Sequence, residues 1–158
     1  MILPDPAAFA GAVAPRHGLL GLDLGTVTIG VATSDRLLTA ATALLTIRRT
    51  KFGSDAARIL DLAAKHETGG IVIGLPLNMD GSEGPRAQSA RAFARNLERL
   101  TALPITFWDE RLSTVAAERA LIAADTSRKR RAEVIDAVAA GYILQGLLDR
   151  LAHMRSLT

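Results

Sequence analysis

The sequence predicts an α/β protein with a mixed central β-sheet of about five strands flanked by helices. Two β-branched runs joined at a glycine-containing turn occupy residues 19–34, and a continuous aliphatic run occupies residues 70–77. A parallel strand that helices cover on both faces needs such an uninterrupted run. Later segments alternate between strand-like and helix-like patterns, which is typical of a sheet with helices packed against it.

The first half of the chain contains most of the expected strands. Residues 19–34 predict two strands that meet at GTVT, and AATALLTI, residues 40–47, predicts a third. A helix is expected from its N-cap Ser54 to the glycines of HETGG. GIVIGLPL, residues 70–77, predicts the strand buried on both faces.

The second half predicts three helices and one strand. Pro85 suits the first turn of a helix that runs to about Leu100, because the N–H that proline lacks is not needed at that position. ITFWDE, residues 105–110, predicts a strand, and STVAAERALIAA a helix. After the basic loop DTSRKRR, a last helix is expected over about residues 132–151.

Length and composition limit the class of protein. The chain of 158 residues fits one domain, expected at residues 18–158, after a flexible arm over residues 1–17 that prolines interrupt. No cysteine is present, which excludes disulfides, thiolate metal sites and thiol nucleophiles. The N-terminal residues lack the basic start of a signal peptide, and no apolar run is long enough to span a membrane. We therefore expect a cytoplasmic protein without a membrane partner.

The positive charge is concentrated in two segments. Nineteen Lys and Arg against sixteen Asp and Glu give a formal net charge of +3, with clusters at SRKRR, residues 127–131, and RRTK, residues 48–51. Such clusters fit a polyanionic partner. Runs of like charge are also common in solvated loops, and charge alone favours that alternative.

Asp23 is an acid inside an apolar strand pattern. Alternation along LLGLDLG puts leucines 20, 22 and 24 on one face and Gly21, Asp23 and Gly25 on the other. The two glycines leave room beside the carboxylate for a metal ion, a phosphate or another backbone. The alternative is a structural Asp23 that caps a turn or pairs with an arginine.

Two other apolar elements also carry acids. Asp136 shares a helical face with small and apolar residues of the last helix, and Asp109 and Glu110 end the strand ITFWDE. Bound Mg²⁺ or Mn²⁺ would explain three converging acids, because these cations prefer carboxylate oxygens. Two such metals support phosphodiester hydrolysis without a His, Cys or Ser nucleophile.

Several motifs resemble the YqgF family of pre-16S rRNA processing nucleases, which are related to Holliday junction resolvases. The matching segments are GLDLGTVTIGVATSD, IVIGLPLNMDGSEGPRAQSARAFA, WDERLSTVAAE and RRAEVIDAVAAGYILQGLLD, in family order over about residues 18–150. The resemblance implies an RNase H-like fold and a divalent-metal nuclease with Asp23, Glu110 and Asp136 as catalytic metal ligands. The choice between Asp109 and Glu110 stays open, because a strand apolar on both faces gives no parity argument.

Five basic residues are candidates for nucleic-acid binding: Arg86, Arg111, Lys129, Arg130 and Arg131. Arg86 follows the glycine-rich loop NMDGSEGP, whose backbone amides could approach a phosphate, although a plain surface loop is the alternative. Arg111 could hold the scissile phosphate or simply neutralise Asp109. Trp108 could stack on a base, but a strand tryptophan is more often part of the core.

The resemblance favours structured precursor rRNA as the partner, with ribosomal precursor particles as its context and branched DNA as the alternative. A sugar-kinase-like phosphotransferase shares the DLGT motif, but this chain has one copy of the domain and no GxxxxGK[ST] loop. A non-catalytic RNA-binding assembly factor is the other alternative. Both a monomer and a homodimer fit the sequence.

Overall fold

The structure is a computed structural model that describes residues 1–112 and 128–157, with the side chains of residues 128–134 outside the description. Its centre is a five-stranded sheet in the order β3-β2-β1-β4-β5. The strands are β1 (Gly18–Leu24), β2 (Thr28–Ser34), β3 (Ala41–Arg48), β4 (Thr68–Leu75) and β5 (Ile105–Asp109). β1, β2 and β3 pair antiparallel, whereas β4 pairs parallel with both β1 and β5. The predicted mixed α/β sheet is confirmed.

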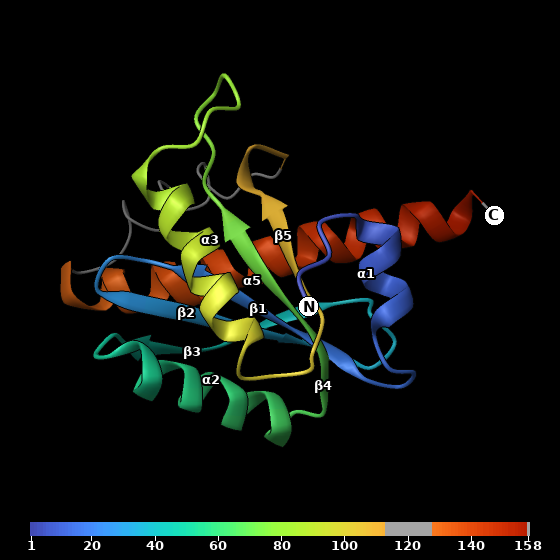
Figure 1. The fold of residues 1–158 in the computed structure, drawn as a ribbon, viewed down its shortest axis with the longest axis horizontal. Coiled ribbons are helices and arrows are strands. Elements are labelled where there is room, and N and C mark those ends of the chain that lie inside the picture. The colour runs from blue at the N-terminus through green and yellow to red at the C-terminus, as the bar shows by residue number, and fades with distance from the viewer. Residues whose placement is uncertain (113–127, 158) are drawn as a thin grey trace.

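Helices cover both faces of this sheet (Figure 1). α2 (Phe52–Lys65) and α3 (Pro85–Glu98) lie on one face, and α1 (Pro6–Ala12) and α5 (Arg128–Ser156) lie on the other. A short 3-10 helix, η1 (Glu110–Leu112), follows β5. Each face of the sheet therefore has its own hydrophobic cluster. No helix in the described parts of the chain is long and apolar enough to cross a membrane.

The N-terminal residues differ from the flexible arm expected over residues 1–17. Pro6 occupies the first turn of α1, where its missing N–H costs nothing, and Asp5 caps that helix by accepting from the Ala8 amide at 3.0 Å. Phe9 is fully buried beneath this helix, in the space that the absent side chain of Gly70 leaves. The Ile105 amide donates to the Met1 carbonyl at 2.8 Å, so the chain start also lies along β5.

The start of α2 and the end of β4 are shifted from their expected positions. α2 begins at Phe52 rather than after Ser54. Its first turn is closed by the buried Asp55 carboxylate, which accepts from the Thr50 amide at 3.1 and 3.2 Å. β4 ends at Leu75, two residues before the expected end.

The last helix begins earlier than the sequence predicts. α5 starts at Arg128, so the backbone of Lys129, Arg130 and Arg131 is helical rather than part of a loop. The helix then continues to Ser156. The helix predicted over residues 113–124 lies outside the described residues.

Glycines let α5 approach the sheet closely. A Cβ atom at Gly30 would lie 1.8 Å from the backbone oxygen of Asp136, and one at Gly21 would lie 2.8 Å from the Leu144 Cβ. Both distances are shorter than real carbon contacts, so the helix occupies the volume of the missing side chains. β1 and β2 are therefore in direct contact with the α5 backbone.

We predict that Gly30→Ala destabilises the fold, because the new methyl group would push α5 off β2. Overpacking of this kind costs about 1–3 kcal/mol or more, and a backbone neighbour cannot rotate away. The measurement is the free energy of unfolding from urea denaturation.

Gly53→Ala is the matched control, since a Cβ there meets nothing within 4 Å. In a helix this change stabilises by up to about 1 kcal/mol. Equal stability of Gly30→Ala and Gly53→Ala would contradict the close contact of α5 with β2.

Candidate active site

The side chains of β1 alternate as the sequence predicts. Leu20 and Leu22 are fully buried in the cluster beneath α2 and α3, so Asp23 lies on the opposite face, towards α5. Only 2% of Asp23 is exposed. An acid this deeply buried requires compensation by its surroundings.

Four glycines surround Asp23 on this face of the sheet. Gly21 and Gly25 lie two residues before and after Asp23 in the chain, and Gly30 lies directly opposite it on β2. Gly74 is on β4, one residue after Ile73, which pairs with Leu22 of β1. We call these residues the glycine ring. Because partners in register point to the same side of a sheet, the neighbours of Asp23 within the sheet place no side chain beside its carboxylate.

Asp136 is brought to the glycine ring by α5. Its backbone covers Gly30, and its Oδ2 atom lies 3.4 Å from the Cβ position of Gly25. The Thr28 hydroxyl donates a hydrogen bond to the same Oδ2 atom. The first residue of β2 thus holds the carboxylate of the last helix on the Asp23 side of the sheet.

Glu110 reaches the ring from the other side. Its carboxyl carbon lies 3.4 Å from the Cβ position of Gly74. On β5, Trp108 faces α5 and packs against Gly146, so alternation places Asp109 on the opposite face. Glu110 begins η1, and its contact with the Gly74 position, which also meets Ile143 of α5, places its carboxyl group on the α5 face. The structure therefore brings Glu110, and not Asp109, towards Asp23.

Asp109 is engaged by Arg111 instead. The guanidinium donates to both carboxylate oxygens at 2.8 to 3.2 Å, and the Arg111 amide donates to Oδ1 at 3.0 Å. These contacts lower the pKa of Asp109 below its usual value, with the side-chain bond from Arg111 as the largest cause. Arg111 also donates to the Met79 carbonyl at 3.3 Å, which ties the loop after β4 to the end of β5.

The donor set at the glycine ring fits a hard divalent cation, because all three side chains offer carboxylate oxygens. Among the described side chains, those of residues 1–112 and 135–157, no three His, Cys, Asp or Glu are already arranged around one metal position. Asp23, Glu110 and Asp136 would therefore have to move closer together around an ion. Mutual repulsion of like charges opposes that approach until a cation is present.

The other predicted contacts with nucleic acid differ in their surroundings. Arg86 lies in the first turn of α3 and donates to the Leu24 carbonyl at 3.4 Å. Leu24 is the residue that follows Asp23 in the chain. The side chains of Lys129, Arg130 and Arg131 lie outside the described residues. Trp108 is 9% exposed and belongs to the core beneath α5.

The glycine-rich loop after β4 uses its amides internally. The Gly81 amide donates to the Asn78 carbonyl at 2.8 Å, and the Ser82 amide donates to Asp80 Oδ1 at 2.9 Å. Gly81 has a φ of 86°, which a side chain would strain. The loop from Asn78 to Ser82 is consequently a closed turn, whereas α3 begins after Gly84 without a side-chain cap.

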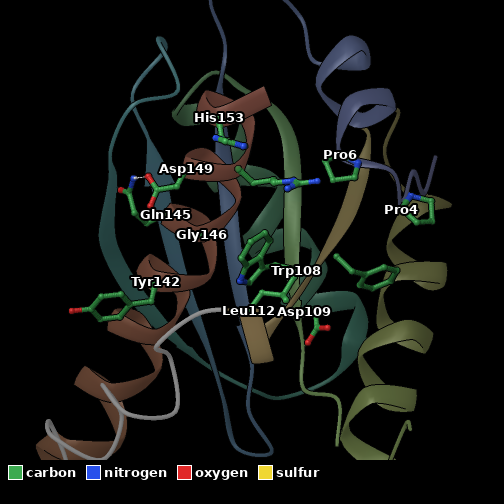
Figure 2. Close-up of a pocket in the computed structure, with 12 residues that line it drawn as sticks. Pro4, Pro6, Trp108, Asp109, Leu112, Tyr142, Gln145, Gly146, Asp149 and His153 are labelled. Carbon is green, nitrogen blue, oxygen red and sulfur yellow. Dashed lines mark hydrogen bonds between the residues drawn. The ribbon is translucent and has the colours of Figure 1, made fainter. Parts of the chain in front are cut away.

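A separate pocket of about 920 Å³ lies on the far side of β5 (Figure 2). Trp108 and Asp109 line it from β5, Pro4 and Pro6 from the chain start, and the C-terminal half of α5 closes it. None of the three acids at the glycine ring lines this pocket. The candidate site is therefore at the glycine ring, not at this pocket.

Sequence reasoning missed two residues at the site. The sequence pattern predicts only a turn at Thr28, whereas the structure shows its hydroxyl bonded to Asp136. The pattern indicates Arg49 only as one charge in the cluster RRTK, whereas its Nη1 atom donates to the Gly25 carbonyl at 2.6 Å. The only available signal was the position of each residue at the end of a strand beside the acids.

Comparisons with known proteins identify the family and the fold of this chain. A family model described as RuvX, Holliday junction resolvase, matches residues 17–150. A protein of Jannaschia sp. (strain CCS1) named "Putative pre-16S rRNA nuclease" is 70% identical over 99% of both chains. A protein of Rhodobacter capsulatus with the same name is 68% identical, over 98% of this chain and 97% of its own.

Among solved structures, T. thermophilus RuvC in complex with a Holliday junction substrate has a similar fold. The TM-score is 0.53 at 13% sequence identity, over 85% of this chain and 96% of RuvC. At this identity the likeness concerns the fold alone, which is RNase H-like.

We predict that the Asp109–Arg111 pair makes stability depend on pH. Because the pKa of Asp109 is lowered in the fold, its ionised form stabilises the native state above its unfolded pKa of about 3.9, and that contribution is lost as the pH falls through the lowered pKa. Asp109→Asn should therefore lower the urea midpoint at pH 7. The difference from the wild type should shrink below about pH 4.

Asp61→Asn removes an exposed carboxylate on α2 and serves as the charge control. Its effect at pH 7 should be smaller, because exposed carboxylates contribute little to stability. An Asp109→Asn difference that persists unchanged to pH 3 would argue against the ion pair as its source.

Proposed function

This chain belongs to the RuvX family, the family that its YqgF-like motifs indicate, and from this membership we propose a divalent-metal-dependent endonuclease that acts on precursor 16S rRNA. The proposed reaction is hydrolysis of phosphodiester bonds near the 5′ end of that RNA during ribosome biogenesis. Its proposed setting is the cytoplasm, with ribosomal precursor particles as partners and with either a monomer or a homodimer as the active form.

The observation that carries the proposal is the placement of three carboxylates around the glycine ring. Asp23 comes from β1, Glu110 from the end of β5 and Asp136 from α5, and each points to the same face of the sheet. We assign to these residues the binding of Mg²⁺ or Mn²⁺. Bound ions of this kind activate a water molecule and stabilise the leaving oxygen of a phosphodiester.

The surrounding residues would fix the acids and the substrate. Thr28 orients the Asp136 carboxylate through its hydroxyl, and the pairing of β1 with β2 and β4 holds Asp23 rigidly. Arg86 would contact the nucleic-acid backbone from the start of α3. Lys129, Arg130 and Arg131 would bind phosphates near the N-terminus of α5, and Arg111 would contribute positive charge beside Glu110.

The relatives favour RNA as the substrate, because their shared name refers to pre-16S rRNA and they match this chain over nearly its whole length. Branched DNA is the second candidate. The family model is described as a Holliday junction resolvase, and the RuvC structure with a similar fold contains a Holliday junction substrate.

Cleavage assays distinguish these substrates. The purified protein is incubated with a labelled precursor 16S rRNA fragment and with a four-way DNA junction, each with Mg²⁺, with Mn²⁺ and with chelator. We expect cleavage of the RNA with metal and none with chelator. Cleavage of the junction alone would transfer the proposal to resolvase activity, and cleavage of neither would contradict a nuclease that acts alone.

Asp23→Asn tests the metal ligand. We expect it to abolish cleavage while the fold survives, because the amide keeps the size of the side chain but removes the charge that holds the cation. With Mg²⁺ the wild type should gain stability, by about 2.7 kcal/mol at one hundred times Kd, since the ion binds the folded state. The variant should show no such gain in thermal melts with Mg²⁺ and with chelator.

A structural role for Asp23 makes the opposite prediction. A carboxylate that caps a turn or pairs with an arginine would stabilise the fold without metal. Asp23→Asn would then lower the melting temperature equally with Mg²⁺ and with chelator, and that result would remove Asp23 from the proposed metal site.

A further inference from the structure

Two arginines converge on the end of β1, immediately after Asp23. Arg49 follows β3 and Arg86 begins α3, and their guanidinium groups donate to the consecutive carbonyls of Gly25 and Leu24. We propose that Arg49 and Arg86 together bind a backbone phosphate next to the scissile one. This inference rests on the proposed nuclease function and adds a binding site to it.

Arg49 is held in place from two sides. Its Nη1 atom lies 2.6 Å from the Gly25 carbonyl oxygen, and its guanidinium carbon lies 5.8 Å from the centre of the Phe93 ring. Phe93 in turn packs edge-to-face on Phe52, with ring centres 5.2 Å apart. The guanidinium is therefore ordered before any ligand arrives, which lowers the entropic cost of binding.

Arg86 approaches the same strand end from the other side. Its Nη2 atom lies 3.4 Å from the Leu24 carbonyl oxygen, and its side chain is exposed. In an extended chain, successive carbonyls point towards opposite neighbours, so Arg49 contacts β1 from the β2 side and Arg86 from the β4 side. The two cations flank the residue pair that follows the proposed metal ligand.

The charges of these two arginines are not neutralised by the described residues. Arg91 pairs with Glu83 at 2.6 Å and Arg111 pairs with Asp109 at 2.8 Å, whereas neither Arg49 nor Arg86 forms an ion pair with the described side chains, those of residues 1–112 and 135–157. Each guanidinium has five N–H donors and uses one on a carbonyl. Their remaining donors fit the oxygens of a phosphate, which arginine binds in a forked geometry.

The position of the two arginines fits a backbone phosphate other than the scissile one. The acids lie on the α5 face of β1, whereas Phe93 and Phe52, which support Arg49, belong to the helices on the opposite face. A nucleic-acid strand that crosses the C-terminal end of β1 would present its scissile phosphate to the acids and a neighbouring phosphate to the arginines. Phosphate contacts position a nucleic acid without reading its sequence, so the site would accept RNA of any sequence.

The test is the salt dependence of binding by Arg49→Met, which keeps the length of the side chain and removes its charge. Binding of a labelled RNA hairpin is measured at several salt concentrations with Ca²⁺, which takes oxygen ligands as Mg²⁺ does. Loss of one phosphate contact should reduce the slope of log K against log salt by about 0.7 to 0.9. Arg86→Met should have the same effect, and the double variant should lose about twice as much.

Arg99→Met is the matched control, because it removes the same charge from an exposed arginine at the far end of α3. Its slope should equal that of the wild type. Arg49→Lys keeps the charge and should retain most of the slope while weakening binding. Thermal melts identify any variant that fails to fold, and the exposed Arg86→Met then decides the question.

An unchanged slope for folded Arg86→Met and Arg49→Met would overturn the proposal, as would an equal reduction for Arg99→Met. Cleavage with Mg²⁺ is measured separately on the same hairpin. Absence of cleavage by a wild type that binds RNA would count against the nuclease function alone, whereas the slopes still decide whether these arginines bind phosphate.

Discussion

The contact between α5 and the glycine-lined face of the sheet is the constraint on which the site depends. The α5 backbone fills the space of a side chain at Gly30, and Leu144 fills that of Gly21. This approach brings Asp136 to Gly25 and leaves Asp23 at the centre of the ring. Larger residues at these positions would move the last helix outward, and the acid of α5 would no longer lie over β1.

Burial of Asp23 is costly unless its charge is compensated. The carboxylate is 2% exposed, and two further acids are directed to the same face. In water such groups would be solvated separately, whereas like charges directed at one buried carboxylate are unfavourable. A hard divalent cation would offset both the cost of burial and the repulsion between the acids. The proposed metal site would therefore also explain why an acid lies at the buried position of Asp23. The proposed phosphate site of Arg49 and Arg86 adds positive charge on the other face of the same edge.

The sequence predicts the part of the site that depends on local periodicity. The faces of β1 follow from LLGLDLG because leucines alternate with glycines and one acid, and the structure has Leu20 and Leu22 opposite Asp23. ITFWDE has no such alternation, so only the contacts of Trp108 with Gly146 and of Glu110 with Gly74 distinguish Asp109 from Glu110. Arg49 and Thr28 could not be identified in advance, because their partners Gly25 and Asp136 are brought to them by tertiary packing. The buried Phe9 was missed for the same reason.

The most direct test of the central claim is a crystal structure grown with Mn²⁺ and measured at a wavelength where manganese scatters anomalously. The account predicts one or two anomalous peaks at the glycine ring, each about 2.0 to 2.5 Å from carboxylate oxygens of Asp23, Glu110 or Asp136. It also predicts that Asp109 stays paired with Arg111. Carboxyl groups more than about 10 Å apart, or manganese bound by Asp109 and not by Glu110, would contradict a shared two-metal site at this sheet edge.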